Sequence, residues 1–521
     1  MRKLVKIGII CILMLMFLSI DSAYSKGQDA DKARQGEDAL DDLLRKFGKD
    51  GEGLAKKIYE AIDSGVAWIM SKQKMDGHYE LYNPGQGGMT YEMGGTALPA
   101  LAVKKSMLGL YEGDEKDLKR EIKNLEKDLE KGKLNAYEKK RLEHLKKYGE
   151  AEIEKRRKMY NSVSKSIEWL RKKYDELKKK TMVTQFGTGT LNIDGRKTYC
   201  IGVTLMLLEA YYTKTMEVKK KTQVAVDKRN IKPADLEWIR EMVQWLSDNQ
   251  QAAYKTTNPQ SNSNDGAWRY PGPAQDGSIV DNSNTQYAVL GLKAASRMGV
   301  HIKDSKVWEQ VCDYYIRTQD ASGPEVKRKP PAQDPNTGKY HFPNSYNKDP
   351  GKDNARGWGY LPKRDQHHPT TGAMTTSGLA ALITAKSELY TAKVLPKNKK
   401  LEEKIDKAIN DGIAWLTHNF TVEGNIDDKK NGHGWNYYYL YGLERVGVLA
   451  QIEFFGKNPW YVLGAKQLVA NQNKEGFWNT GSTVGDSTNL GDTAFAILFL
   501  KRATTPVEVP LKVPRPEITE K

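Results

Sequence analysis

One supersecondary pattern recurs along most of this sequence and constrains its fold. In the last copy, residues 464–472 form an amphipathic segment that ends in Gln472, a Gly476-Phe477-Trp478 turn follows, and residues 492–500 are almost wholly apolar. Apolar residues three and four positions apart predict a helix in the first segment, and the apolar run predicts a buried helix in the last. The unit is therefore a hairpin with one outer and one inner helix.

The same unit occurs in five further copies of lower fidelity. Their outer segments and turns contain Gln73 with Gly77, Gln250 with Gly266, Gln319 with Gly357, Trp415 with Gly434, and, in the weakest copy, Trp169. One such hairpin cannot bury its own apolar face, so the copies must stack or close on one another. The sequence predicts an all-α fold, an (α/α)6 toroid of six helical hairpins over residues 54–505.

The spacing Ala465-x-x-Leu468-x-x-x-Gln472-x-x-x-Gly476-x-Trp478 resembles the QW repeat of squalene and hopene cyclases. Protein prenyltransferase β subunits share the toroid of that family. The resemblance covers about residues 57–502 and implies that the Gln caps a neighbouring helix and that the Trp stacks on a helix end. It implies much less about chemistry, because fold and function are separable.

The first 25 residues are typical of a signal peptide. Arg2, Lys3 and Lys6 precede an apolar run at 7–20, and Ala23 and Ser25 supply small residues at the cleavage site. The run is short for a membrane span, so cleavage is favoured over an uncleaved anchor. We therefore expect an exported protein, periplasmic or extracellular, without an integral membrane span. A polar lead-in at 26–53 and a Pro-rich tail at 506–521 flank the toroid.

Two insertions interrupt the repeats. Residues 112–160 are dense in Lys and Glu, and Leu118, Ile122, Leu125 and Leu129 follow a coiled-coil spacing, which predicts an inserted helical hairpin. This hairpin is either a solvated extension or a docking arm for a protein partner. Residues 320–356 form a Pro/Gly-rich loop, for which a lid over the ring and a flexible decoration are equally supported.

Charge and cysteine content exclude some functions. The net charge of +16 comes without a nucleic-acid-binding motif, so we expect a solubilising surface and no nucleic-acid partner. After removal of the signal peptide, Cys200 and Cys312 remain in apolar helices. Their spacing forms no disulfide framework, so two buried thiols are favoured over a disulfide.

The cyclase family opens one inner helix with Asp-x-Asp-Asp-Thr-Ala, whose central Asp protonates an alkene. The corresponding residues here are Asp281-Asn282-Ser283-Asn284-Thr285. A neutral hydroxyl at Ser283 is no strong acid, so proton-initiated cyclisation is not expected. Asp281 and Asp492 are the catalytic candidates, although each is more typical of a helix cap, where the helix terminus favours the ionised form.

The prenyltransferase resemblance implies Asp, Cys and His ligands on zinc, and the inner segments lack an Asp-x-Cys pair. His367, His368 and His433 precede inner segments, but adjacent loop histidines are more often solvated. We expect no metal and no cofactor.

Aromatic side chains gather near the starts of the inner segments. The candidates for ligand binding are Trp268, Tyr287, Trp358, Trp435 and Tyr438. They are either the structural aromatics of the repeat or the walls of a cleft. A polysaccharide-acting (α/α)6 enzyme would also need two carboxyl groups, for which Glu92, Asp281, Asp486 and Asp492 are candidates.

Two functional hypotheses follow. The first is an exported toroid without proton-initiated cyclase activity, which binds an apolar or polymeric ligand in its ring or a protein partner through residues 112–160. The alternative is an enzyme, either a divergent terpenoid cyclase or a polysaccharide-acting toroid. The sequence leaves open whether the protein is catalytic.

Overall fold

The computed structural model describes most of the chain between residues 53 and 507. The described residues are 53–80, 82–83, 89–90, 92–107, 110, 112–134, 136–179, 181–184, 187–190, 197–218, 221–250, 266–269, 280–302, 304–327, 351–362, 368–479 and 489–507, with Leu40 and Leu44. The predicted signal peptide, nearly all of the lead-in, residues 328–350 of the long loop and residues 508–521 of the tail lie outside this set, as does His367.

The chain divides into two compact units. The smaller unit contains residues 1–55, 108–156 and 212–230, and the larger unit contains residues 56–107, 157–211 and 231–521. The larger unit holds nearly all of the repeated helical hairpins.

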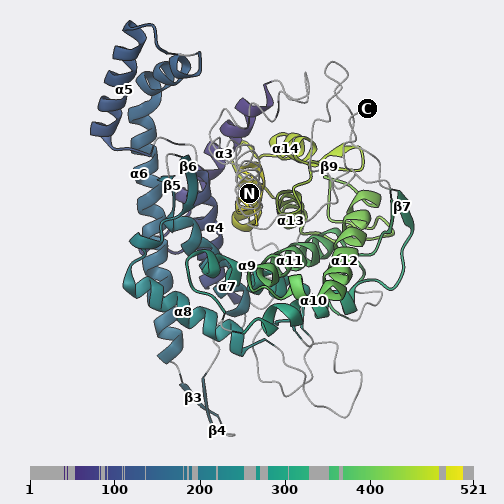
Figure 1. Ribbon diagram of the computed structural model, residues 1–521. Helices are drawn as coiled ribbons and strands as arrows, with labels where there is room; N and C mark the ends of the chain where they lie inside the picture. The colour runs from purple at the N-terminus through teal and green to yellow at the C-terminus, as the bar shows by residue number, and fades with distance from the viewer. Residues whose placement is uncertain are drawn as a thin grey trace, which may run out of the picture. The chain divides into compact units, whose positions relative to one another are not determined.

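Six inner helices form a closed ring in the larger unit. In chain order they are α4 (Glu92–Ser106), α7 (Lys197–Tyr212), α9 (Asn282–Arg297), α11 (Gly372–Thr391), α13 (Asn436–Leu449) and α15 (Asn489–Leu500). Figure 1 shows α11 beside α9 and α13, and α15 packs on both α13 and α4. Glycines close the remaining gap: a Cβ on Gly94 would lie 2.4 Å from the Tyr199 ring, and one on Gly202 would lie 2.3 Å from the Tyr287 carbonyl oxygen. The predicted set of six inner helices is confirmed.

Six outer helices alternate with the inner ones along the chain. They are α3 (Leu54–Ser71), the second part of α6 (Ala136–Lys179), α8 (Pro233–Asp248), α10 (Lys306–Thr318), α12 (Lys399–His418) and α14 (Trp460–Ala470). Helix α10 buries a single stripe that includes Trp308, Val311 and Tyr315, whereas α11 is buried along almost its whole length. This difference follows from the amphipathic outer and apolar inner sequences, and it confirms the predicted all-α toroid.

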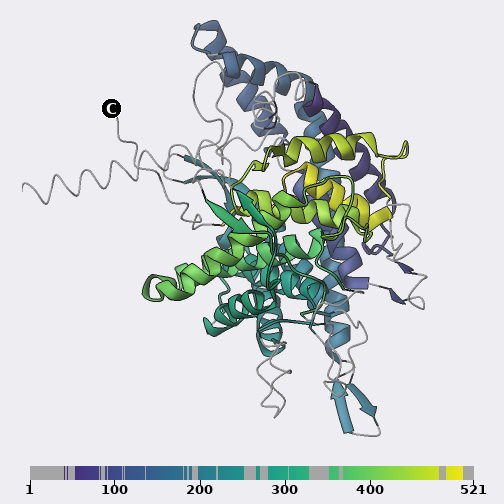
Figure 2. The same cartoon turned by 90° about the vertical axis from the view of Figure 1, so that its right-hand side faces the viewer.

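The remaining elements are short. Among the described residues, five two-stranded antiparallel hairpins connect helices: β1 (Tyr82–Asn83) with β2 (Met89–Thr90), β3 (Thr181–Thr184) with β4 (Gly187–Thr190), β5 (Thr213–Val218) with β6 (Lys221–Val226), β7 (Glu325–Lys327) with β8 (Lys352–Asn354), and β9 (Phe454–Phe455) with β10 (Asn458–Pro459). The described 3-10 turns occupy Lys228–Asn230 and Leu395–Lys397. Figure 2 shows how small these strands are beside the helices.

The inserted helical hairpin is present in the smaller unit. Helix α5 (Glu115–Glu130) begins at a capping box formed by Asp114 and pairs with the first part of α6. Ion pairs between Arg141 and Glu121 at 2.8 Å and between Lys146 and Glu126 at 2.6 Å join the two helices. Whether this hairpin docks a protein partner stays a prediction.

Helix α6 is longer than the sequence pattern suggested. We expected the hairpin to end near residue 160 and a separate outer helix to follow it, but one helix of 44 residues covers both. Residues 150–179 contain neither Gly nor Pro, so nothing in that stretch ends a helix.

Cys200 and Cys312 are both buried free thiols, which confirms that interpretation. Among the described residues, no helix combines the length and the apolar character that a membrane span requires.

Glutamine side chains connect consecutive outer helices, and we call each connection a Gln clamp. Each clamp uses one side-chain amide nitrogen, which donates both to the turn of its own hairpin and to a backbone carbonyl of the next outer helix. At 2.8–3.1 Å, Gln73 binds Gly77 and Ser162, Gln250 binds Gly266 and Val307, Gln319 binds Arg356 and Ala408, and Gln472 binds Gly476 and Ala61. The Gln472 clamp joins the last outer helix to the first and so closes the outer ring.

This geometry differs from what the resemblance implied for the Gln. A capping Gln would accept hydrogen bonds from free N–H groups at a helix end, whereas these amides donate to carbonyl oxygens on the flank of the next helix. The turn brings the side chain to that flank, which exposes carbonyls and no free N–H group.

The turn aromatics also make hydrogen bonds. The indole of Trp268 donates to Leu246, that of Trp358 to Tyr315 and that of Trp478 to Leu468, each at 2.8 Å and each in the last turn of its own outer helix. Their backbone N–H groups donate to a buried Thr of the inner helix, as in Trp268 to Thr285 at 3.0 Å. The turn thus joins both helices of its hairpin.

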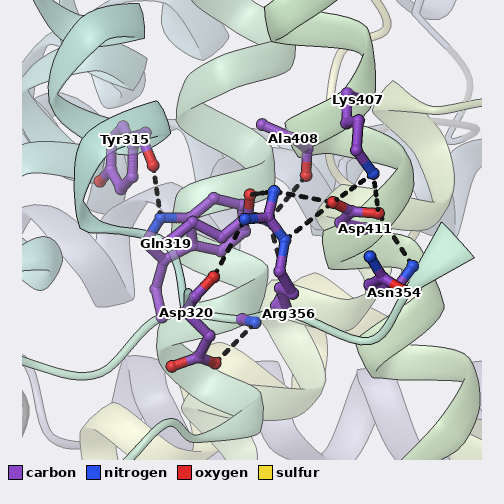
Figure 3. Close-up of polar contacts among 10 residues, drawn as sticks. Tyr315, Gln319, Asp320, Asn354, Arg356, Lys407, Ala408 and Asp411 are labelled. Carbon is purple, nitrogen blue, oxygen red and sulfur yellow. Dashed lines mark hydrogen bonds and ion pairs between the residues drawn. The ribbon is translucent and has the colours of Figure 1, made fainter. Parts of the chain in front are cut away.

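The Gln319 clamp replaces the turn glycine with an ion pair (Figure 3). Arg356 occupies the position that Gly77, Gly266 and Gly476 hold elsewhere, and its Nε donates to Asp411 Oδ2 at 2.8 Å. Its Nη2 donates to Gln319 Oε1 at 3.0 Å, and Lys407 also pairs with Asp411. Because the Asp411 side chain is fully buried, these cations offset the cost of burying its charge.

Candidate functional site

Trp268 and Trp358 lie in the wall of the ring. Both side chains are 0% exposed, and both indole N–H groups are used by the outer helices. This placement accounts for them as structural aromatics of the turns. The ligand-binding role predicted for them stays a prediction.

Asp281 is the N-cap of α9. Its Oδ1 accepts a hydrogen bond from the Asn284 backbone N–H at 2.7 Å, and its Oδ2 accepts one from the Asn284 side-chain amide at 2.8 Å. Burial raises the pKa of Asp281 to about 6, although these hydrogen bonds act in the opposite direction. We expected the helix terminus to hold the carboxyl group ionised, but loss of hydration is the larger effect here.

Asp492 lies in the first turn of α15 and is half-buried. The burial of Tyr437 and, to a smaller extent, the negative charge of Asp492 raise the pKa of Tyr437 to about 12. The catalytic role of both aspartates stays a prediction.

Ser283, which the resemblance places at the position of the cyclase acid, faces a neighbouring inner helix. Its hydroxyl lies 3.2 Å from Tyr438 Oη on α13, and the same phenol lies 3.4 Å from Ser377 Oγ on α11. The Gln286 amide also donates to Tyr438 Oη. Tyr438, one of the predicted ligand-binding residues, therefore joins the inner helices α9, α11 and α13 near their N-terminal ends.

A buried cation lies deeper in the ring. Arg445 on α13 is 2% exposed, its Nη1 donates to Gln286 Oε1 at 2.7 Å, and its guanidinium lies 4.3 Å from the Tyr441 ring centroid. Burial alone would lower the pKa of Arg445, but the phenols of Tyr441 and Tyr287 outweigh burial and raise it. Arg445 thus remains charged inside the ring.

Aromatic rings from four inner helices surround this cation. Tyr287 contacts Tyr199 edge-on at 4.7 Å between centroids, and its centroid is 6.0 Å from the Arg445 guanidinium. Phe495 packs on Tyr438 at 5.5 Å and on Tyr441 at 6.0 Å. We define the central cluster as Ser283, Gln286, Tyr287, Ser377, Tyr438, Tyr441, Arg445 and Phe495.

The sequence pointed to Tyr287 and Tyr438 but missed Arg445, Gln286, Tyr441 and Phe495. A usable signal was present, because Glu444 and Arg445 are charged residues inside an otherwise apolar helix. Buried charges are rare unless they are paired or functional.

The central cluster lies between a more open end and a closed end. Ser283 and Tyr438 are partly exposed, and Arg445 follows Tyr438 by seven helical residues, about 10 Å deeper. At the C-terminal ends of the inner helices, Glu444 binds Thr504, and Arg297 donates to the carbonyls of Thr505 and Pro506 at 3.0 Å. The last described residues of the chain thus cover that end.

Trp435 lies at the start of α13. It is 49% exposed, and its φ of +57° is a left-handed conformation that bulky residues rarely adopt. Of the predicted ligand-binding aromatics, Trp435 offers the most ring surface to solvent. Its binding role stays a prediction.

In the part of the chain that the structure describes, no three His, Cys, Asp or Glu side chains converge as a metal site would require. His433 instead pairs with Asp427, with 3.0 Å between Nε2 and Oδ2. Burial acts to raise the pKa of Asp427, but hydrogen bonds from His433, Asn431 and Lys429 outweigh it and lower that pKa to about 2.

Comparison with known proteins gives little beyond the fold. No family model and no curated protein matches the chain. Two solved structures of the type II terpene cyclase MstE from Scytonema are similar, one of an apo variant and one of a variant in complex with geranylgeranyl dihydroxybenzoate. Each is 10% identical, has a TM-score of 0.40 and covers 86% of this chain and 97% of that chain. The likeness concerns the fold alone and says nothing of substrate or reaction.

Proposed function

We propose that this chain is an exported ligand-binding toroid that does not carry out proton-initiated cyclisation. The ligand binds at the central cluster, inside the ring of inner helices. The observation that carries this proposal is the buried cation Arg445, which lies against the faces of Tyr441 and Tyr287.

A permanent positive charge at this place opposes carbocation chemistry. A carbocation formed about 6 Å from the guanidinium would be destabilised by about 3 kcal/mol at an effective dielectric constant of about 20. That penalty slows a reaction about a hundredfold. The aromatic faces that attract cations already hold Arg445, so they are poorly placed to stabilise a second one.

The acid that would start such a reaction is also missing from its expected place. Ser283 pairs with Tyr438, and both carboxylate oxygens of Asp281 accept hydrogen bonds from Asn284. Asp281 is thereby held as a cap. Binding without cyclisation requires neither a proton donor nor a cation-stabilising wall.

The burial of the cluster favours a compact ligand over a polymer. Gln286, Tyr287 and Arg445 are all at most 2% exposed, whereas a bound polymer needs an open groove along its length. A ligand with an apolar body would enter beside the partly exposed Ser283 and Tyr438.

Native mass spectrometry of the protein from its own host tests this proposal. We expect the mass of a chain lacking about 25 N-terminal residues and a co-purifying lipid or isoprenoid that organic extraction releases. As a parallel assay, the purified protein is incubated with squalene and with geranylgeraniol. A cyclised product that disappears in the Asp281→Asn variant would overturn the proposal, and a full-length mass in the cytoplasmic fraction would overturn its export.

A further inference from the structure

We propose that the central cluster binds an oxyanion, a carboxylate or a phosphate, on an amphipathic ligand, through Arg445 Nη2 and Tyr287 Oη. This inference rests on the proposed ligand-binding function and specifies the chemistry of the ligand. The anionic group would lie at the closed end, and the apolar body would extend along Phe495 and Tyr438 toward the more open end.

Two unused hydrogen-bond donors belong to this cluster, on residues whose guanidinium and ring centroid are 6.0 Å apart. Within the described residues, Arg445 Nη2 and Tyr287 Oη have no hydrogen-bond partner, and their side chains are 2% and 1% exposed. Buried polar atoms without a partner are uncommon in native proteins, and each calls for a specific explanation. An acceptor supplied by a ligand satisfies both donors.

The charge of Arg445 is also unpaired among the described residues. Its described hydrogen-bond partners are neutral, the amide of Gln286 and the phenol of Tyr441, and no described carboxylate lies within ion-pair distance of it. Glu444, its neighbour in sequence, accepts hydrogen bonds from the Thr504 backbone at 3.2 Å and from its hydroxyl at 2.6 Å. A buried guanidinium is costly unless an anion accompanies it.

The guanidinium is already positioned for such a ligand. Its planar group lies over Tyr441, and one of its nitrogens is fixed by Gln286, so the remaining N–H groups point in a set direction. Charge-assisted hydrogen bonds from Arg to carboxylate or phosphate are shorter and stronger than neutral ones. The rings of Tyr287, Tyr441 and Phe495 around it are buried, and a low local dielectric constant strengthens such an interaction.

Matched probes that share one alkyl chain test the proposal. Binding of dodecanoate, dodecyl phosphate and dodecan-1-ol to the delipidated mature chain is measured by calorimetry, and acetate and inorganic phosphate serve as free anions. We expect at least one of the two anionic amphiphiles to bind about tenfold or more tightly than the alcohol. The free anions should bind far more weakly than the amphiphiles, because they lack the apolar body.

Three variants identify the residues. Arg445→Gln should reduce the affinity for the anionic amphiphile to that for the alcohol and leave the alcohol affinity unchanged. Tyr287→Phe, which keeps the ring and its packing, should reduce the preference severalfold. Tyr439→Phe is the control on α13, the helix that carries Arg445. Its hydroxyl donates to the Thr421 carbonyl outside the central cluster, so this variant should keep the full preference. Near-UV circular dichroism verifies that each variant is folded.

The outcomes separate the two proposals. Equal affinities for the anionic amphiphiles and the alcohol would overturn the oxyanion site and leave the ligand-binding function standing. Absence of binding by all three amphiphiles would overturn both. Free phosphate that binds as tightly as dodecyl phosphate would overturn the amphipathic ligand. If Arg445→Gln fails to fold, an unchanged preference in Tyr287→Phe overturns the assignment of the phenol, and the wild-type preference still decides on the anion.

Discussion

Replacing Gly476 by Ala should weaken the junction at which the outer ring closes. Gly476 has a φ of +95°, and a Cβ on it would lie 2.6 Å from the carbonyl oxygen of Ser64 on α3. Gln472 donates to carbonyls of both Gly476 and Ala61 at this place. The new methyl group would therefore push α3 away from the turn and stretch the clamp.

The magnitude has two parts. A left-handed backbone costs an L-residue about 1–2 kcal/mol. A contact of 2.6 Å to a backbone oxygen cannot be relieved by a side-chain rotation, so α3 must shift, and overpacking of this kind costs about 1–3 kcal/mol. We expect Gly476→Ala to lower the free energy of unfolding by about 2–5 kcal/mol.

Gly434→Ala is the matched control. Its φ is +63°, but no atom lies within 4 Å of the position of its Cβ, so only the backbone cost applies. The difference between the two variants isolates the contact with Ser64 and should be about 1–3 kcal/mol.

Urea unfolding followed by tryptophan fluorescence measures this difference. All 11 Trp residues belong to the larger unit, so the signal reports the ring without the smaller unit. The free energy follows from the midpoint and the slope of the transition. Losses that are equal in the two variants to within about 0.5 kcal/mol would refute the reasoning. Effects of mutations at independent sites add to within about that margin, so a smaller difference would leave no contribution from the contact with Ser64.

Three further predictions concern single side chains. Burial raises the pKa of Glu444 from its ordinary value of 4.5 to about 7, although hydrogen bonds from Thr504 act in the opposite direction. Between these two pH values the native state keeps a proton that the unfolded chain loses, so the free energy of unfolding falls by about 3 kcal/mol as the pH rises from 4.5 to 7. Glu444→Gln should remove that part of the pH dependence of the urea midpoint, and an unchanged profile would contradict it. Asp411→Asn should cost about 3 kcal/mol in urea unfolding, because it leaves the Arg356 charge uncompensated, and a loss under about 1 kcal/mol would contradict this. Trp435→Gly should relieve the strain of the left-handed backbone and raise the free energy of unfolding by about 1 kcal/mol, which a higher urea midpoint would report. A lower free energy of unfolding would show instead that the indole stabilises the fold.

The repeats could be predicted because their signal is local. Gln472, Gly476 and Trp478 lie within seven residues, and each makes part of its contacts inside its own hairpin. The helix periods and the turn glycines therefore indicated the toroid without knowledge of any distant contact. The partner carbonyls on the next outer helix could not be predicted in the same way.

The Gln319 clamp shows where local reasoning fails. The sequence placed Gly357 in the turn-glycine position, whereas the structure places Arg356 there, with its N–H bound to the Asp411 carbonyl at 3.2 Å. The substitution works because Asp411, 55 residues away in the chain, accepts the side chain. A pattern search for glycine cannot find a position that an ion pair has taken over.

The central cluster was beyond prediction for the same reason. Gln286 and Arg445 are separated by 159 residues, and only ring closure brings α9 and α13 together. The adjacent charged residues Glu444 and Arg445 in an apolar helix marked Arg445 as unusual in the sequence. Which residues surround it, and therefore what it could bind, depends on contacts with other helices. A guanidinium stays charged by its own high pKa, and no described carboxylate lies within ion-pair distance of Arg445.

Two residues on different helices change the chemistry of the ring in the same direction. Ser283 on α9 takes away the proton source that the cyclase resemblance would place there, and Arg445 on α13 adds a positive charge to the same interior. Either change alone could be offset, since a proton could come from another acid and a cation could be paired. Together they make the interior a poor place for a carbocation, because one removes the proton source and the other raises the electrostatic potential, and the raised potential makes it a good place for an anion. The nature of the bound head group is therefore the measurement that separates a carrier from a catalyst.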